Sequence, residues 1–221
     1  MQKLQQTKKY ILDSNVYGEM VVDKELQELR ENFEMLRKVV LVYGINSIIR
    51  KELRNTPKKI KVESKNLRNY LLMLYDNFTK GHEIKIFSDT ESIVNNYHKT
   101  YRELGGSKSK DEIYKDFVIV ASASKNGMDI IVSQDEKSMR TENAIRAYKI
   151  VNDANKIMTP EFIEYKRFKD ILRSQPNKLI SGSNKFWVFL IFLNLFYKLI
   201  KINLFPFHIL LKTSSNINIF R

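Results

Sequence analysis

The sequence predicts an α/β fold, a three-layer α/β/α sandwich around a central, mainly parallel sheet. Short apolar runs rich in β-branched residues alternate with longer segments in which apolar residues recur every three to four positions. Such alternation is typical of a parallel sheet covered by helices on both faces. The chain has 221 residues, of which 43% are hydrophobic and 29% charged. These values fit one well-formed core and argue against disorder.

The first part of the chain predicts two strands and three helices. Strands are expected at residues 9–13 and 39–43, and helices at residues 23–38, 46–54 and 64–78. Asn46 or Ser47 can cap the second of these helices, which must end before Pro57. Ser64 is the expected N-cap of the third.

The second part continues the alternation. Helices are expected at residues 89–104, 111–125, 141–153 and 160–173, and strands at residues 129–133 and 157–159. Ser88 or Asp89 begins the first of these helices, and Gly105 and Gly106 end it. Pro160 stands where the last helix is expected to begin.

Four acidic residues lie against these predicted elements: Asp13, Glu52, Asp116 and Asp135. Asp13 ends the first strand and Asp135 follows the strand at 129–133, so both belong to the carboxyl edge of the sheet, where parallel sheets form their sites. Glu52 occupies an apolar-face position of its helix, and Asp116 opens a buried stretch. Carboxylates repel one another and are costly to bury. The joint pattern therefore predicts a bound cation.

Each acid taken alone also has a simpler interpretation. Glu52 can be a helix-edge residue in water or paired with a neighbouring arginine, and Asp116 can be solvated or paired with Lys115. Asp13 and Asp135 can form ordinary turns or caps. These interpretations stay open at this point, and only the order of the four acids favours a shared site.

The motifs around the acids, in their order along the chain, resemble those of the PIN-domain family. They read Ile-Leu-Asp13-Ser-Asn-Val, then Glu52-Leu, then Asp116-Phe-Val-Ile-Val-Ala-Ser-Ala, then Ile-Val-Ser133-Gln-Asp135. The resemblance covers about residues 9–173 and implies a PIN-like nuclease domain at residues 1–178. In that family the four acids share a pocket that binds Mg²⁺ or Mn²⁺ and cleaves RNA.

The resemblance also implies roles for individual residues. Asp13 and Asp116 would be the principal metal ligands, with Glu52 and Asp135 completing the pocket. Ser14, Asn15 and Ser133 match positions where small polar groups orient the ligands. One bound metal would lower the pKa of a water, and a second, if present, would stabilise the leaving oxygen.

The charge of the chain fits a polyanionic partner. The net charge is +13, and the basic residues Arg50, Arg54, Lys58 and Lys59 follow or flank Glu52, where they can contact the RNA backbone. A solvated helix face explains these four nearly as well. The chain has no cysteine, which excludes disulfides and thiolate metal sites and fits a cytoplasmic location.

These observations together predict a metal-dependent endoribonuclease, either the toxin of a toxin–antitoxin pair or an RNA-processing enzyme. The alternative is a non-catalytic RNA- or protein-binding module that retains the fold. RNA is the expected partner, and an antitoxin protein and a second copy of the chain are further candidates.

The last 43 residues, 179–221, differ from the rest. They contain five basic residues, no acidic residue and a strongly apolar run. Gly182 and Val188 are their only residues with codons that begin with G, a bias expected of AT-rich DNA translated out of frame or past a lost stop codon. An aberrant extension is therefore preferred over a membrane-associated segment, and both over a genuine subdomain.

Overall fold

The computed structural model describes residues 7–26, 36–37 and 40–174. The chain divides after Arg173, and the first unit, Met1–Arg173, contains all of these residues except Ser174. Residues 179–221 and most of the helix expected at residues 23–38 lie outside the described residues. The domain boundary expected near residue 178 stays a prediction. Within the described part, no helix is both long and apolar enough to cross a bilayer.

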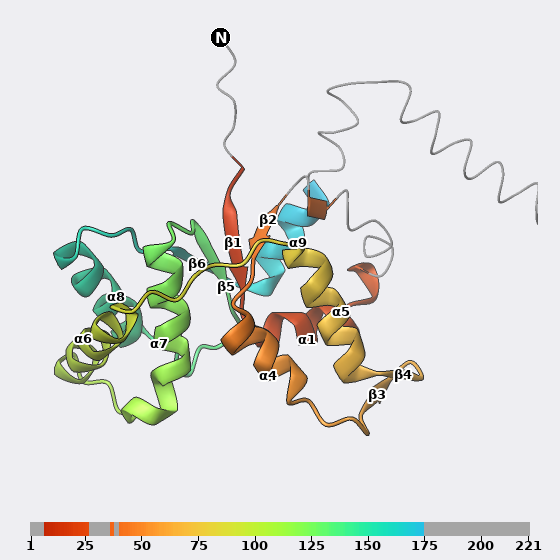
Figure 1. Cartoon of the computed structure of the whole chain (residues 1–221), viewed down its shortest axis with the longest axis horizontal. Coiled ribbons are helices and arrows are strands. Elements are labelled where there is room, and N and C mark those ends of the chain that lie inside the picture. Colours follow the sequence, from red (N-terminus) through yellow and green to blue (C-terminus); the bar gives the residue numbers. More distant parts are fainter. Residues whose placement is uncertain (1–6, 27–35, 38–39, 175–221) are drawn as a thin grey trace, which may run out of the picture. The chain divides into compact units, whose positions relative to one another are not determined.

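A four-stranded parallel sheet forms the centre, with the strand order β2-β1-β5-β6 (Figure 1). Its strands are β1 (Lys9–Leu12), β2 (Leu41–Tyr43), β5 (Ile130–Val132) and β6 (Glu161–Ile163). Ile11 on β1 lies opposite Tyr43 on one side and Ile131 on the other. All three residues of β5 are buried, as expected for a central strand covered on both faces.

A bridge beyond β2 extends the sheet at Gly44. The Gly44 N–H donates to the His82 carbonyl at 2.8 Å, and the Ile84 N–H donates to the Gly44 carbonyl at 3.0 Å. A Cβ atom at position 44 would lie 2.2 Å from the Tyr75 hydroxyl, so only glycine fits there.

Helices cover both faces of the sheet, which confirms the predicted α/β/α class. The helices are α1 (Ser14–Val22), α4 (Lys51–Arg54), α5 (Leu67–Thr79), α6 (Thr90–Glu103), α7 (Lys110–Lys125), α8 (Glu142–Ala154) and α9 (Tyr165–Ser174). Figure 1 shows α6, α7 and α8 together on one side of the sheet and α1, α5 and α9 on the other. A 3₁₀ turn at Lys24–Leu26, a π-helical turn at Asn46–Arg50 and a small hairpin, β3 (Lys61–Val62) with β4 (Lys65–Asn66), complete the described elements.

Several sequence predictions of the first half are wrong in detail. Helix α1 was not predicted, because Gly18 and its valines give the segment a weak helical preference, yet its buried residues pack into the core. The helix at 46–54 has no side-chain cap from Asn46 or Ser47, since it begins after Ile45 as a π-helical turn. Helix α5 is capped by Asn66 and not by Ser64; the Asn66 side chain accepts from the Asn69 N–H at 3.1 Å.

The end of the domain also differs from the prediction. The strand expected at residues 157–159 lies further on, at Glu161–Ile163, and Pro160 precedes this strand instead of beginning a helix. Residue 157 is bound to the end of α8, because its N–H donates to the Asn152 carbonyl at 3.0 Å. The last helix therefore begins only at Tyr165. A proline at the start of a strand removes no ladder hydrogen bond, so it fits this position.

Candidate acidic site at the carboxyl edge of the sheet

Asp13 is a buried carboxylate at the end of β1, with only 6% of its surface exposed. The peptide after β1 turns directly into α1, and Asp13 caps this helix. Its Oδ1 accepts from the Ser14 N–H at 2.7 Å, and its Oδ2 accepts from the Asn15 side chain at 2.8 Å. Burial raises the pKa of Asp13, and the negative charges of Glu52 and Asp135 raise it further, against the lowering effect of its hydrogen bonds.

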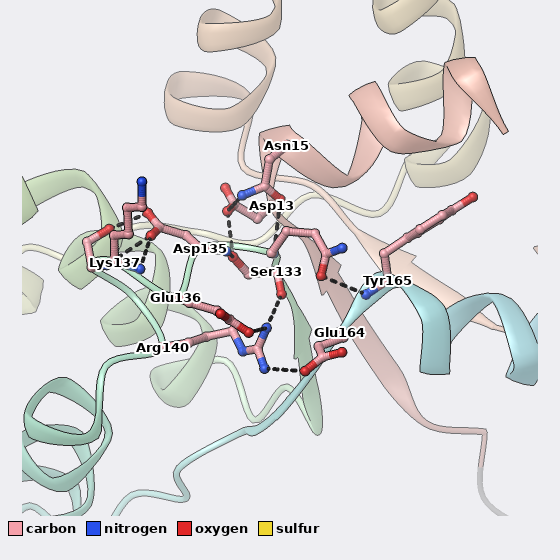
Figure 2. Close-up of polar contacts among 11 residues, drawn as sticks. Asp13, Asn15, Ser133, Asp135, Glu136, Lys137, Arg140, Glu164 and Tyr165 are labelled. Carbon is pink, nitrogen blue, oxygen red and sulfur yellow. Dashed lines mark hydrogen bonds and ion pairs between the residues drawn. The ribbon is translucent and has the colours of Figure 1, made fainter.

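Ser133, at the end of β5, links two of the predicted ligands (Figure 2). Its hydroxyl donates to Asp13 Oδ2 at 2.8 Å and accepts from the Asp135 N–H at 3.1 Å. The Asn15 Oδ1 accepts from the Gln134 N–H at 3.3 Å, which joins α1 to the same loop. Adjacent parallel strands β1 and β5 thus bring residues 13 and 133 together although 120 positions separate them in sequence.

Asp135 organises the loop that leads from β5 to α8. Its carboxylate accepts from the N–H groups of Lys137 and Ser138, at 2.8 and 2.9 Å, and from the Ser138 hydroxyl. Although partial burial raises the pKa of Asp135, these hydrogen bonds and the charge of Lys108 outweigh it, and the pKa lies below its usual value. The interpretation of Asp135 as a turn residue is therefore correct, and the same turn directs its carboxylate toward the other acids.

Asp116 lies on α7, and its pKa is raised like that of Asp13. Burial raises the pKa of Asp116 to about 6, and the charges of Asp13 and Asp135 add to this effect. A hydrogen bond with Ser138 and the charge of Lys108 act in the opposite direction. Carboxylates from β1, the β5–α8 loop and α7 therefore share one electrostatic environment.

Glu52 reaches the same environment from α4. It is half-buried, and its charge contributes to the raised pKa of Asp13. Of the two arginines that could pair with it, Arg50 and Arg54, the first has another partner: Arg50 donates to Asp76 through Nε at 2.7 Å and Nη2 at 2.9 Å. Arg50 is thus held against α5, whereas Arg54, Lys58 and Lys59 are exposed.

The acids fit a divalent cation in ligand type but are not assembled around one position. Asp13, Asp116, Asp135 and Glu52 offer only oxygen donors, which hard cations such as Mg²⁺ and Mn²⁺ prefer. In the described part of the chain, however, no group of three or more Asp, Glu or His side chains is close enough to hold one ion. The site thus has the oxygen ligands and the negative charge that a cation needs, but in this structure the carboxylates lie too far apart to bind one ion together.

Three residues around the acids were not predicted from sequence: Ser138, Lys108 and Arg140. Arg140 donates through Nη1 to the Ser133 carbonyl at 3.0 Å and through Nη2 to Glu164 Oε1 at 3.1 Å (Figure 2). It thereby joins the ends of β5 and β6 directly beneath Ser133. A Ser or Arg a few residues after a strand is common in sequences, so only the hydrogen bonds distinguish these positions.

Comparisons with known proteins give little independent information. No protein-family model matches the chain, and no curated protein matches it. Among solved structures, one match is described as "Structure of FitAB bound to IR36 DNA fragment", with 15% sequence identity, a TM-score of 0.43, and coverage of 71% of this chain and 94% of the other.

Proposed function

We propose that this chain is a PIN-type, divalent-metal-dependent ribonuclease. The observation that carries the proposal is the buried carboxylate of Asp13, which shares its electrostatic environment with Glu52, Asp116 and Asp135. A fold gains nothing in stability from burying like charges together, whereas a cation makes the arrangement favourable. A basic chain with such a site suits a phosphodiester substrate.

The residues of the site have separate roles in this proposal. Asp13 and Asp116 would hold Mg²⁺ or Mn²⁺, and Glu52 and Asp135 would complete or support the ligand set. An ion of this kind supplies an activated water and neutralises charge on the phosphate. Asn15 and Ser133 donate to Oδ2 of Asp13 and the Ser14 N–H donates to Oδ1, so the three groups together fix both oxygens. Such groups orient the carboxylate, and the hydrogen bonds from Ser133 and Ser14 oppose the rise in its pKa.

Ser138 and Lys108 extend the site beyond the four acids. The Ser138 hydroxyl donates to Asp135 and helps to lower the pKa of Asp135, whereas burial is the main reason for the higher pKa of Asp116. Lys108 lowers the pKa of both aspartates, so its positive charge lies near them and is suitably placed to attract a phosphate. Whether the enzyme is a toxin or an RNA-processing enzyme is a further question, and an antitoxin protein and a second copy of the chain stay candidate partners.

The test is cleavage of labelled RNA by the purified chain, with Mn²⁺ or with EDTA. We expect cleavage only with metal, and Asp13→Asn should reduce it by more than about 100-fold, because even groups that merely orient ligands change metal affinity by 10–100-fold. Asp153→Asn is the matched control, since Asp153 is exposed on α8 away from the acids. Metal-independent RNA binding without cleavage would favour the binding module instead.

A further inference from the structure

A basic hairpin projects from the domain next to α4 and α5, and we define it as the basic arm, residues 57–66. It contains four exposed lysines and a single acid, Glu63; the lysines are Lys58, Lys59, Lys61 and Lys65. Figure 1 shows its two strands, β3 and β4, at the end of α5 where that helix begins. The hairpin was not predicted, because its strands have only two residues each, although Lys58 and Lys59 were expected to contact RNA.

The lysines of the arm have no ion pair in the described part of the chain. Lys65 lies over the ring of Tyr70, with Nζ 5.5 Å from the ring centroid, which leaves its charge available. Of the neighbouring arginines, Arg50 is paired with Asp76, whereas Arg68 donates through Nε to the neutral Thr56 carbonyl at 2.7 Å and keeps its charge. The arm therefore carries four exposed positive charges that continue those of the exposed Lys51 and Arg54 on α4.

The arm is held in a defined conformation although it lies outside the core. The Leu67 N–H donates to the Ile60 carbonyl at 3.0 Å, and the Asn66 side chain donates to the Lys58 carbonyl. At its tip, Glu63 and Ser64 have φ angles of 49° and 65°, the left-handed conformation that two-residue hairpin turns require. Neither residue is glycine, so this turn costs energy that the rest of the arm must offset.

We propose that the basic arm binds the phosphodiester backbone of single-stranded RNA and directs the strand to the acidic site. The proposal rests on the proposed function and adds the surface by which the substrate is held. Helix α4 connects the two regions, since it carries Glu52 of the site and ends at Arg54, just before the arm. Lysines without partners on a fixed hairpin provide a row of point charges that neutralises phosphates without reading bases.

The test compares two quadruple Lys→Gln variants of the full chain that differ only in where charge is removed. The arm variant changes Lys58, Lys59, Lys61 and Lys65. The control changes four exposed lysines distant in sequence from the arm: Lys85, Lys99, Lys149 and Lys156. Affinity for a fluorescein-labelled single-stranded RNA is measured by fluorescence anisotropy in EDTA over a series of salt concentrations. The absence of divalent metal prevents cleavage by the proposed mechanism during the measurement.

We expect the arm variant to bind at least 10-fold more weakly, with a slope of log affinity against log salt that is shallower by about 3, because each lost phosphate contact removes about 0.7. The control should stay within about twofold of the parent in affinity, since its charges lie elsewhere on the surface. Replacing the four arm lysines by arginine should preserve binding and shows that the loss is one of charge. Equal losses in arm variant and control, or no RNA binding by the parent, would overturn the proposal.

These outcomes are separate from those for the nuclease. A parent that cleaves RNA while the arm variant binds it unchanged contradicts the arm alone. A parent that fails to cleave RNA with any metal, yet loses RNA binding in the arm variant, contradicts the nuclease and supports the arm.

Discussion

Helix α7 contributes to two polar clusters, one toward each end: one is neutral and buried, and the other is acidic and only partly buried. Toward its C-terminus, Ser124 belongs to a neutral cluster centred on Asn152, which is fully buried. The Asn152 Nδ2 donates to Ser124 Oγ at 3.0 Å and to Thr159 Oγ1 at 2.9 Å, and its Oδ1 accepts from the Tyr97 hydroxyl at 2.5 Å. In the other half of the helix, Asp116 faces carboxylates of its own sign.

The difference separates a cluster that the fold satisfies by itself from the cluster that we propose binds a metal ion. Both the amide nitrogen and the amide oxygen of Asn152 have hydrogen-bond partners, so burial strengthens these bonds and the group needs no ligand. At Asp116, burial and neighbouring charges oppose ionisation, and the domain is less stable at neutral pH for retaining the acid. Buried polarity alone therefore does not identify a site. The acids differ from the Asn152 cluster because the negative charges of neighbouring acids raise the pKa of Asp13 and of Asp116.

The largest effect on stability should come from breaking the neutral cluster. Asn152→Leu leaves Tyr97, Ser124 and Thr159 without their buried partner, and we expect the free energy of unfolding to fall by about 3 kcal/mol. Urea denaturation measures this change. Any stabilisation by Mn²⁺ should persist, because Asn152 is not among the acids. Asn96→Leu, the same change at an exposed position of α6, should alter stability little, and an equal loss there would show that the cluster has no special weight.

Removing the charge at Asp116 should have an effect of similar or smaller size and of opposite sign. Because the folded-state pKa is about 6, above the ordinary value of 3.8, the native state binds the proton more tightly and loses stability as pH rises from about 4 to 6. Asp116→Asn removes this loss and should raise the free energy of unfolding at pH 7 by up to about 3 kcal/mol. Below pH 4 the parent and the variant should be equally stable.

Thermal melts between pH 4 and 7, without metal, measure the difference at Asp116. Asp13, whose pKa is also raised, likewise makes the stability of the parent fall as pH rises. Asp135, whose pKa is lowered, makes the stability of the parent rise with pH. The comparison of parent with variant cancels both contributions to first order. A stability difference that does not depend on pH would contradict the assignment. The variant should also lose any metal-induced rise in melting temperature.

The sequence predicted the layers of this fold better than its local details. The predicted positions are confirmed for helices α6, α7 and α8 and for strands β1, β2 and β5. In these elements apolar residues recur with the period of a helix, or form a short apolar run typical of a strand. Helix α1 was missed because its nine residues follow a strand without a loop, and only Asp13 as its cap indicates where it begins. Strand β6 was predicted too early in the sequence, because Ile157 was interpreted as part of a strand. Its side chain instead packs against the core just after α8.

For the site, sequence predicted the acids but could not predict how each is held. The order of four short motifs identified Asp13, Asp116, Asp135 and Glu52 as acids near one sheet edge, since strand ends and helix faces follow from periodicity. The hydrogen bonds that distinguish Asp135 from Asp116 come from Ser138, which lies in a loop without periodicity. The sequence likewise could not predict that Arg50 pairs with Asp76, because Asp76 belongs to another helix.

The smallest effect on stability should come from a change at Arg140. This residue supports the acidic cluster through Ser133 but is not one of the acids. Its guanidinium bonds both the Ser133 carbonyl and Glu164, a geometry that a lysine ammonium cannot reproduce at both partners. Because Glu164 is exposed, we expect Arg140→Lys to lower the free energy of unfolding by only about 1 kcal/mol. Ser133, however, donates to Asp13, so a shift of its carbonyl also moves that hydroxyl. Mn²⁺ affinity, measured by calorimetry, should therefore fall about 10-fold.

Arg167→Lys is the control, since Arg167 pairs with Glu161 on the surface of β6 and contacts none of the acids. A loss of stability in Arg140→Lys with unchanged Mn²⁺ affinity would show that the residue only joins two strand ends. A selective loss of affinity shows that β5 and β6 are held together in order to orient the carboxylate.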